Sequence, residues 1–121
     1  MIEQLHGFPE NVVAFVGHGQ VAKADYISTL IPAVERALTG HDLLRLYYEL
    51  GADVAGIDAD AIFEDFKFGV GHVTRFERVA LVTDIEWIAH AVSLFSFLIP
   101  GAMRLFATKD VDQARSWIVS N

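Results

Sequence analysis

The sequence predicts an α/β domain, in which about four helices pack on a mixed, mostly parallel five-stranded sheet. The chain has 121 residues, of which 53% are hydrophobic, enough for one core and too few for two. Short apolar stretches alternate with amphipathic ones, and residues 79–106 contain a complete strand, helix and strand unit. Because such alternation produces mainly parallel sheets, we expect residues 1–121 to form a single domain of this class.

The first two strands are predicted at residues 1–5 and 11–16, joined by a turn that contains Gly7 and Pro9. They should pair as a hairpin. A third, central strand is predicted at residues 43–50, a run of apolar and aromatic side chains, with a loop at residues 51–56 after it.

Two helices are predicted from apolar side chains that recur at helical spacing. The first covers residues 22–38, and its apolar face consists of Tyr26, Ile27, Leu30, Ile31, Val34 and Leu38. Pro32 should kink this helix, because a mid-helix proline removes a hydrogen bond. The second helix should begin at Asp58, which supplies an N-cap, and end near His72.

The unit at residues 79–106 begins with a strand at 79–82. Thr83 and Glu86 fit a capping box at the start of the next helix, in which each side chain bonds to the backbone of the other. Pro100 and Gly101 end that helix before a strand at 103–106. A last helix should begin at Asp110, with Gln113 in the capping-box position.

Charge and composition exclude several kinds of protein. The net charge is -7 and Lys and Arg are not clustered, which argues against nucleic-acid and anionic-membrane partners. The chain has no cysteine, so disulfides and thiol chemistry are impossible. Residues 87–103 contain no Asp, Glu, Lys or Arg but are cut by Pro100 and Gly101, which favours a buried helix over a transmembrane segment. No secretory signal is visible, so we expect a cytoplasmic protein.

Two motifs imitate catalytic or nucleotide sites. Residues 17–22 match the G-x-G-x-x-A dinucleotide pattern, with Glu49 ending the next strand, but we prefer a tight turn that needs two glycines, because Glu49 lies farther along than the usual spacing. Glu86, His90 and Ser93 form one helical stripe that resembles a hydrolase triad. A straight helix offers no oxyanion donors beside such a stripe, so we interpret it as a solvated face.

The acidic residues Asp58, Asp60, Glu64 and Asp65 cluster at one helix start, where they complement the helix dipole. Asp60 and Glu64 share a face, and a solvated pair explains them more simply than a metal or acid–base site. The five histidines include no close pair of ligands. We therefore expect no metal site, no cofactor and no catalytic residue.

Two aromatic side chains fall on the polar faces of their predicted helices. Phe97 lies among Glu86, His90 and Ser93 on the helical wheel, and Phe68 lies among Glu64, Asp65 and His72. Neighbouring helices covering each other would explain them, as would a dimer face, a partner face or an apolar ligand site. The candidate ligand or partner surface is Phe68, His72, Trp87, His90 and Phe97.

Over essentially its whole length the chain resembles the SpoIIAA-like family, which is grouped with STAS domains and CRAL-TRIO lipid-transfer domains. The resemblance rests on residues 25–26, 30–33, 47–50, 82–87, 100–101 and 104–106. It implies a sheet wound with helices as a β/α superhelix, in a family without a settled biochemical role.

The STAS side of the resemblance implies partner switching through a phosphorylated serine or threonine after the central strand. Residues 40–73 contain neither, so a reversible phosphate switch cannot operate there. Asp53 and Asp58 would instead hold fixed negative charges, with Glu49 closing the central strand. The CRAL-TRIO side implies an apolar, lipid-like ligand, which in so short a domain must lie in a shallow groove or be shared with a partner chain.

Three functional hypotheses follow. The leading one is a non-enzymatic binding module that forms a homodimer and presents an apolar groove to a lipid-like molecule or a protein helix. The alternative is a protein-interaction regulator of the STAS type without the phosphorylated serine. A third is an enzyme that uses the strand-end positions Glu49, Thr83 and Asp84, where α/β folds usually bind ligands.

Overall fold

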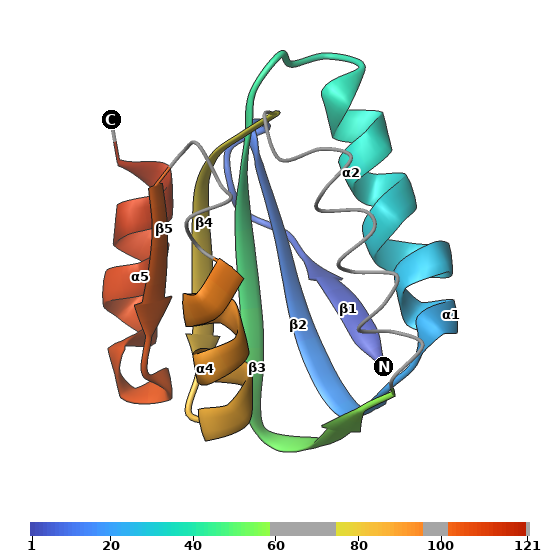
Figure 1. The fold of residues 1–121 in the computed structure, drawn as a ribbon. Coiled ribbons are helices and arrows are strands. Elements are labelled where there is room, and N and C mark those ends of the chain that lie inside the picture. The colour runs from blue at the N-terminus through green and yellow to red at the C-terminus, as the bar shows by residue number, and fades with distance from the viewer. Residues whose placement is uncertain (59–74, 96–101, 121) are drawn as a thin grey trace.

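The computed structural model describes residues 1–58, 75–95 and 102–120, and these form one five-stranded sheet in the order β1-β2-β3-β4-β5 (Figure 1). The strands are β1 (Ile2–Leu5), β2 (Val12–Val21), β3 (Leu44–Ile57), β4 (Phe76–Thr83) and β5 (Ala102–Phe106). β1 runs antiparallel to β2, and every other neighbouring pair is parallel. The predicted mixed, mostly parallel five-stranded sheet and its opening hairpin are confirmed.

Strands β2 and β3 are longer than their sequence predicts. Residues 17–21 and 51–56, expected as turn and loop, continue the two strands, because Gly19 pairs with Val54 and Gln20 pairs with Gly56. The pairing register shifts on both sides of Gly19, whose φ of 55° lies in the left-handed region that glycine tolerates best. The dinucleotide interpretation of residues 17–22 is therefore wrong, since its loop is a strand with a bulge.

The helix predicted at residues 22–38 is present from Lys23 to Leu38 and changes its winding on the way. It consists of α1 (Lys23–Asp25), a π-helical turn (Tyr26–Leu30) and α2 (Ile31–Leu38). Pro32 stands in the first turn of α2, directly after the π-helical turn, so the change of winding falls beside the proline. Because the π-helical turn holds more residues than an α-helical turn, its side chains do not point where α-helical spacing predicts. Ile27, predicted to be buried, is 52% exposed.

The unit at residues 79–106 has the predicted order of elements. Helix α4 (Glu86–Phe95) follows β4, and β5 is followed by a 3-10 turn (Thr108–Asp110) and α5 (Val111–Val119). Asp110 precedes α5 as predicted but makes no capping bond with its side chain. The helix expected between Asp58 and His72 lies outside the described residues. None of the described helices is long and apolar enough to cross a membrane.

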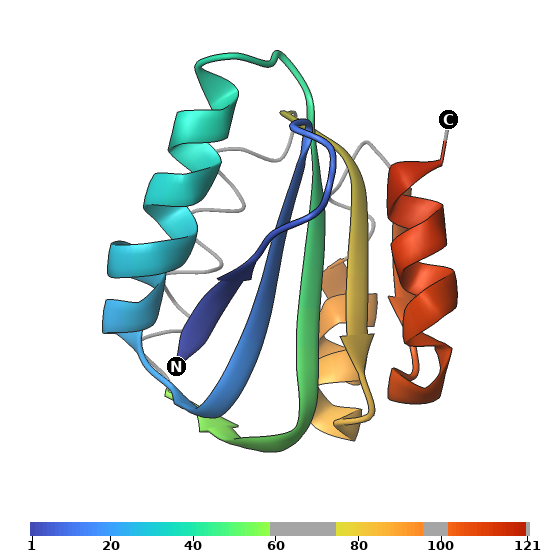
Figure 2. The same cartoon turned by 180° about the vertical axis from the view of Figure 1, so that it is seen from behind.

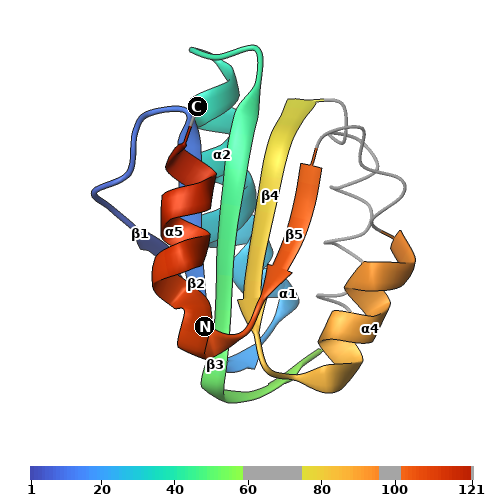
Figure 3. The same ribbon diagram turned by 90° about the vertical axis from the view of Figure 1, so that its left-hand side faces the viewer.

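Helices cover both sides of the sheet. α1 and α2 lie on one side and α5 on the other (Figures 1 and 2), and Figure 3 shows α5 in front of the strands. The first side holds a core that includes Phe15, Tyr26 and Ile88, so α4 contributes to the same core as α1 and α2. The second side holds a smaller core around Tyr47, beneath Ala114 and Ile118 of α5. Within residues 1–58, 75–95 and 102–120, α1, α2 and α4 thus pack on one side of the sheet and α5 packs on the other.

Candidate functional site

The predicted ligand or partner surface is only partly described. Trp87 stands in the first turn of α4 and is 49% exposed, and His90 is exposed on the same helix. Phe68, His72 and Phe97 lie outside the described residues. Ile88 of α4 is buried against the sheet, so the exposed Trp87 belongs to a different aspect of the helix. Trp87 is the largest exposed apolar side chain among the described residues.

Thr83 and Asp84 both act as caps at the carboxyl end of β4, but in a different way from the predicted capping box. The backbone N–H of Ile85 donates to the Thr83 hydroxyl at 3.1 Å, two residues on rather than three. Asp84 accepts hydrogen bonds from the Thr108 backbone N–H at 2.9 Å and from the Thr108 hydroxyl. These two bonds hold the pKa of Asp84 below its usual range, and the bond from the Thr108 hydroxyl has the larger effect. Asp84 thereby ties the end of β4 to the turn before α5.

Asp53 lies on β3 itself rather than in a loop, and its carboxylate faces a histidine from β2. Nδ1 of His18 lies 2.6 Å from Oδ2 of Asp53, while Nε2 lies 3.8 Å from Oε1 of Glu3 on β1. The hydrogen bond with His18 is the main reason that the pKa of Asp53 lies below its usual range. His18 therefore links the three neighbouring strands β1, β2 and β3 at one end of the sheet.

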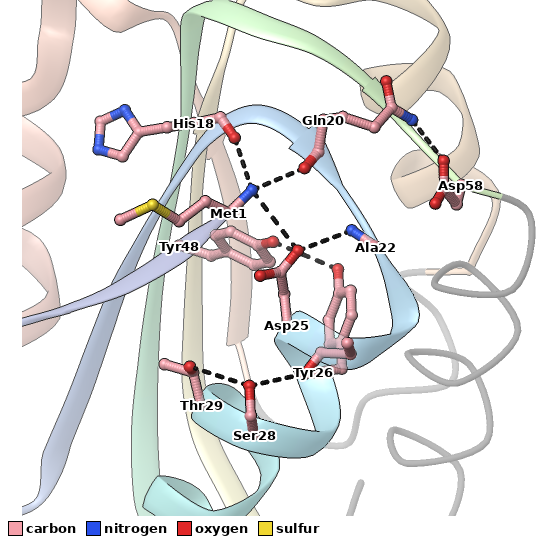
Figure 4. A network of polar contacts seen from close by, with 11 residues as sticks. Met1, His18, Gln20, Ala22, Asp25, Tyr26, Ser28, Thr29, Tyr48 and Asp58 are labelled. Atoms are coloured by element: carbon pink, nitrogen blue, oxygen red, sulfur yellow. Dashed lines mark hydrogen bonds and ion pairs between the residues drawn. The ribbon is translucent and has the colours of Figure 1, made fainter.

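Asp58 follows β3 and belongs to a polar network beside the start of α1 (Figure 4). Gln20 donates a hydrogen bond of 2.5 Å to Asp58. The amino group of Met1 donates to the backbone carbonyls of His18 and Gln20 at 2.7 and 2.6 Å, and lies 3.5 Å from the Asp25 carboxylate. Asp25 also accepts a bond from the N–H of Ala22, which satisfies a free donor at the helix start. The network fastens the bulged end of β2 to the helix after it.

Glu49 lies on the side of β3 that faces α5, in a cluster that sequence reasoning missed. The hydroxyl of Tyr47 donates to Oε1 of Glu49 at 2.6 Å. Nε of Arg115 donates to the Tyr47 hydroxyl at 3.4 Å, and Nη2 lies 3.6 Å from the same Glu49 oxygen. The spacing of Tyr47 and Glu49, two apart on one strand, is a signal that they share a face. Arg115 is 68 residues from Tyr47, and no local pattern links them.

The environment of Tyr47 raises its pKa from 10.0 to about 12, first because the ring is buried and second because the hydroxyl donates to Glu49. A raised pKa means that folding favours the protonated phenol. The stability that Tyr47 contributes is therefore fully present below pH 10 and is lost as the pH rises through about 12.

We expect a tyrosinate titration, followed by ultraviolet absorbance, to show a step near pH 12 that the Tyr47→Phe variant lacks. In Glu49→Gln that step should move toward lower pH, because the anionic acceptor of the hydroxyl is removed. The guanidinium-unfolded protein is the control and should show no step above the ordinary tyrosine value. Identical titrations for the wild type and Tyr47→Phe would contradict this assignment.

The described side chains do not assemble a metal centre. No group of three or more His, Cys, Asp or Glu side chains in residues 1–58, 75–95 and 102–120 is placed to hold a metal ion. Glu49, Thr83 and Asp84, the strand-end positions of the enzyme hypothesis, each hold a partner within the fold. Their geometry therefore gives that hypothesis no support, and the ligand surface on α4 stays the stronger candidate.

Comparisons with known proteins agree with this architecture. The model of a family described as SpoIIAA-like matches residues 12–119. A crystal structure of an uncharacterized protein from the DUF3478 family with a SpoIIAA-like fold, from Shewanella loihica PV-4, matches with a TM-score of 0.72. Its sequence is 24% identical, and the alignment covers 98% of this chain and 92% of that chain. At that identity the likeness shows a shared fold. Comparison with curated proteins gives no match.

Proposed function

The chain belongs to the SpoIIAA-like family, and from that premise we propose that it is a non-enzymatic binding module. It self-associates through α4 and holds an apolar, lipid-like molecule against the same helix. The observation that carries the proposal is the exposure of Trp87, 49% in a helix whose other face packs on the sheet. Covering the exposed half of an indole would yield roughly 2 kcal/mol, so this position favours an apolar partner.

The regulator hypothesis stays a prediction. Asp53 and Asp58 are both exposed, which a charged interaction surface requires. Each nevertheless holds a partner within the fold, His18 for Asp53 and Gln20 for Asp58. A binding partner would have to replace or share these contacts, whereas Trp87 needs only to be covered.

The replacement Trp87→Ser tests the proposal. We expect light scattering at micromolar concentration to give twice the chain mass of 13.4 kDa for the wild type and a single chain mass for the variant. Diphenylhexatriene, a neutral apolar dye, should fluoresce on binding to the wild type and much less with the variant. The matched control is Leu43→Ser, because Leu43 is 48% exposed and lies before β3, away from α4.

Trp87 can also be observed directly. The chain has two tryptophans, so Trp117→Phe leaves Trp87 as the only indole that emits. Its emission should shift to shorter wavelength as concentration rises, because self-association removes the indole from water. A wild-type chain that stays monomeric, or equal dye binding by Trp87→Ser and Leu43→Ser, would refute the proposal.

A further inference from the structure

Two surface hollows flank the turn between β1 and β2, and they share His6, Gly7 and Phe8 as a common wall. The first has a volume of about 390 Å³ and lies between the turn and α2. The second has a volume of about 330 Å³ and lies between the turn and α5. Its lining is completed by Arg115, Ser116 and Val119. We call this second hollow the α5 groove.

The α5 groove combines apolar walls with a positive charge. Phe8 is partly buried and Val119 is 42% exposed, so both present carbon surface. Ser116 adds a hydroxyl and Arg115 adds a permanent charge. None of the described residues that line it is acidic, although the whole chain carries 16 Asp and Glu against 9 Lys and Arg. The α5 groove therefore carries the positive charge of Arg115 on a protein whose net charge is -7, and this charge complements an anion.

Arg115 is held in position from the sheet side. Its guanidinium lies 6.0 Å from the ring centre of Phe8 and 5.7 Å from that of Tyr47. Nε and Nη2 face Tyr47 and Glu49, while Nη1 has no partner among the described residues. The side chain is 49% exposed. An arginine fixed by two of its nitrogens loses little entropy when the third binds a ligand.

We propose that the α5 groove binds a small organic carboxylate that carries an apolar body. Nη1 of Arg115 and the Ser116 hydroxyl bind the carboxylate, and Phe8 and Val119 contact the apolar part. A volume of about 330 Å³ is at the low end for ligand pockets, which favours a short molecule over a long lipid chain. Glu49 already balances part of the Arg115 charge, so the affinity is modest. This site goes beyond the proposed function, since it uses α5 rather than α4 and depends on charge.

The test is a titration of the full chain with octanoate, followed by amide NMR shifts. Shifts should concentrate at residues 6–8 and 115–119. Octanol, which lacks the charge, and acetate, which lacks the apolar body, should each bind at least about tenfold more weakly. Arg115→Gln should weaken octanoate binding about tenfold or more, because it removes a charge-assisted hydrogen bond.

Two further variants keep the result interpretable. Ser116→Asp places a negative charge on an exposed groove residue without touching Tyr47, and it should also weaken binding about tenfold or more. Lys109→Gln removes a positive charge before α5, away from the groove residues, and should bind octanoate as the wild type does. Thermal unfolding confirms that each variant is folded.

The proposal is overturned if folded Arg115→Gln and Ser116→Asp bind octanoate like the wild type, or if octanol binds equally well. Shifts centred on α4, or no octanoate binding at millimolar concentration, would overturn it too. The outcome is separable from the proposed function, because Trp87→Ser changes dimerisation and binding of a neutral dye and leaves the α5 groove intact.

Discussion

Arg45→Ala is expected to lower the free energy of unfolding by about 1.5 to 3 kcal/mol, the usual cost of losing a charge-assisted hydrogen bond to a buried carbonyl. Arg45 is 9% exposed on β3. Its Nη1 donates to the backbone carbonyl of Ile118 at 3.0 Å and to that of Ser120, and its Nε donates to Glu77 at 3.1 Å. These carbonyls stand at the end of α5, where a helix has no internal donors left.

Arg45 acts beside a second arginine. Arg45 and Arg78 are direct partners in the pairing of β3 with β4. Arg78 donates to the carbonyls of Trp117 and Ser120 at 2.8 and 2.9 Å. Two cations thus hold the negative end of the α5 dipole against the sheet. Arg78 still holds the end of α5 in the Arg45→Ala variant, so the helix should stay attached but open more often. Hydrogen exchange should therefore accelerate more in α5 than in the rest of the chain.

Urea unfolding measures the effect. Arg45→Lys keeps the charge but loses the forked donor geometry, so its loss should be intermediate. The matched control is Arg36→Ala, an exposed arginine on α2 whose bond to the Pro32 carbonyl is 3.5 Å long; it should change stability by less than about 0.5 kcal/mol. Equal losses of unfolding free energy in Arg45→Ala and Arg36→Ala would show that the bonds from Arg45 to the end of α5 contribute nothing to stability.

Local pattern predicted most of the fold, because each element carries its own signal. Helical spacing predicted the helix that runs from Lys23 to Leu38, and the apolar run at 79–82 predicted β4. What the pattern could not predict is pairing over distance. The glycine-containing segments 17–21 and 51–56 resemble turns by themselves and are strands because each hydrogen-bonds to the other. Tertiary contact overrides local propensity at such positions.

The same distinction applies to the candidate site. Trp87 and His90 were predicted as part of a ligand or partner surface; both side chains are exposed, and their binding role stays a prediction. Thr83 and Asp84 were predicted as caps, yet the partner of Asp84 is Thr108, from a later turn. Arg115 was not predicted, because its partners Tyr47 and Glu49 come from a distant strand. Residue types identified caps and exposed faces, while only the assembled sheet shows which of them meet.

Gly17→Val is expected to destabilise the chain by about 1 to 3 kcal/mol, the usual cost of forcing carbon atoms into a packed core. Gly17 is buried on β2, between Ile2 of β1 and Leu50 of β3. A Cβ at this position would lie 2.6 Å from Cδ2 of Leu50 and 3.4 Å from Cγ2 of Val21. Leu50 is 2% exposed, so its side chain has little room to move. Urea unfolding of the variant measures the loss.

A double-mutant cycle identifies the cause. Leu50→Ala alone should cost about 2 to 5 kcal/mol, because it leaves a cavity. In the Leu50→Ala background Gly17→Ala should cost less than it does alone, since the new methyl group occupies part of that cavity, and the coupling should exceed about 0.5 kcal/mol. Gly40→Ala is the control, because nothing lies within 4 Å of a Cβ there. Additive losses at Gly17 and Leu50 would refute the explanation that packing against Leu50 requires glycine at position 17. Coupling would instead establish that position 17 requires glycine because the side chain of Leu50 occupies the space that a Cβ would need.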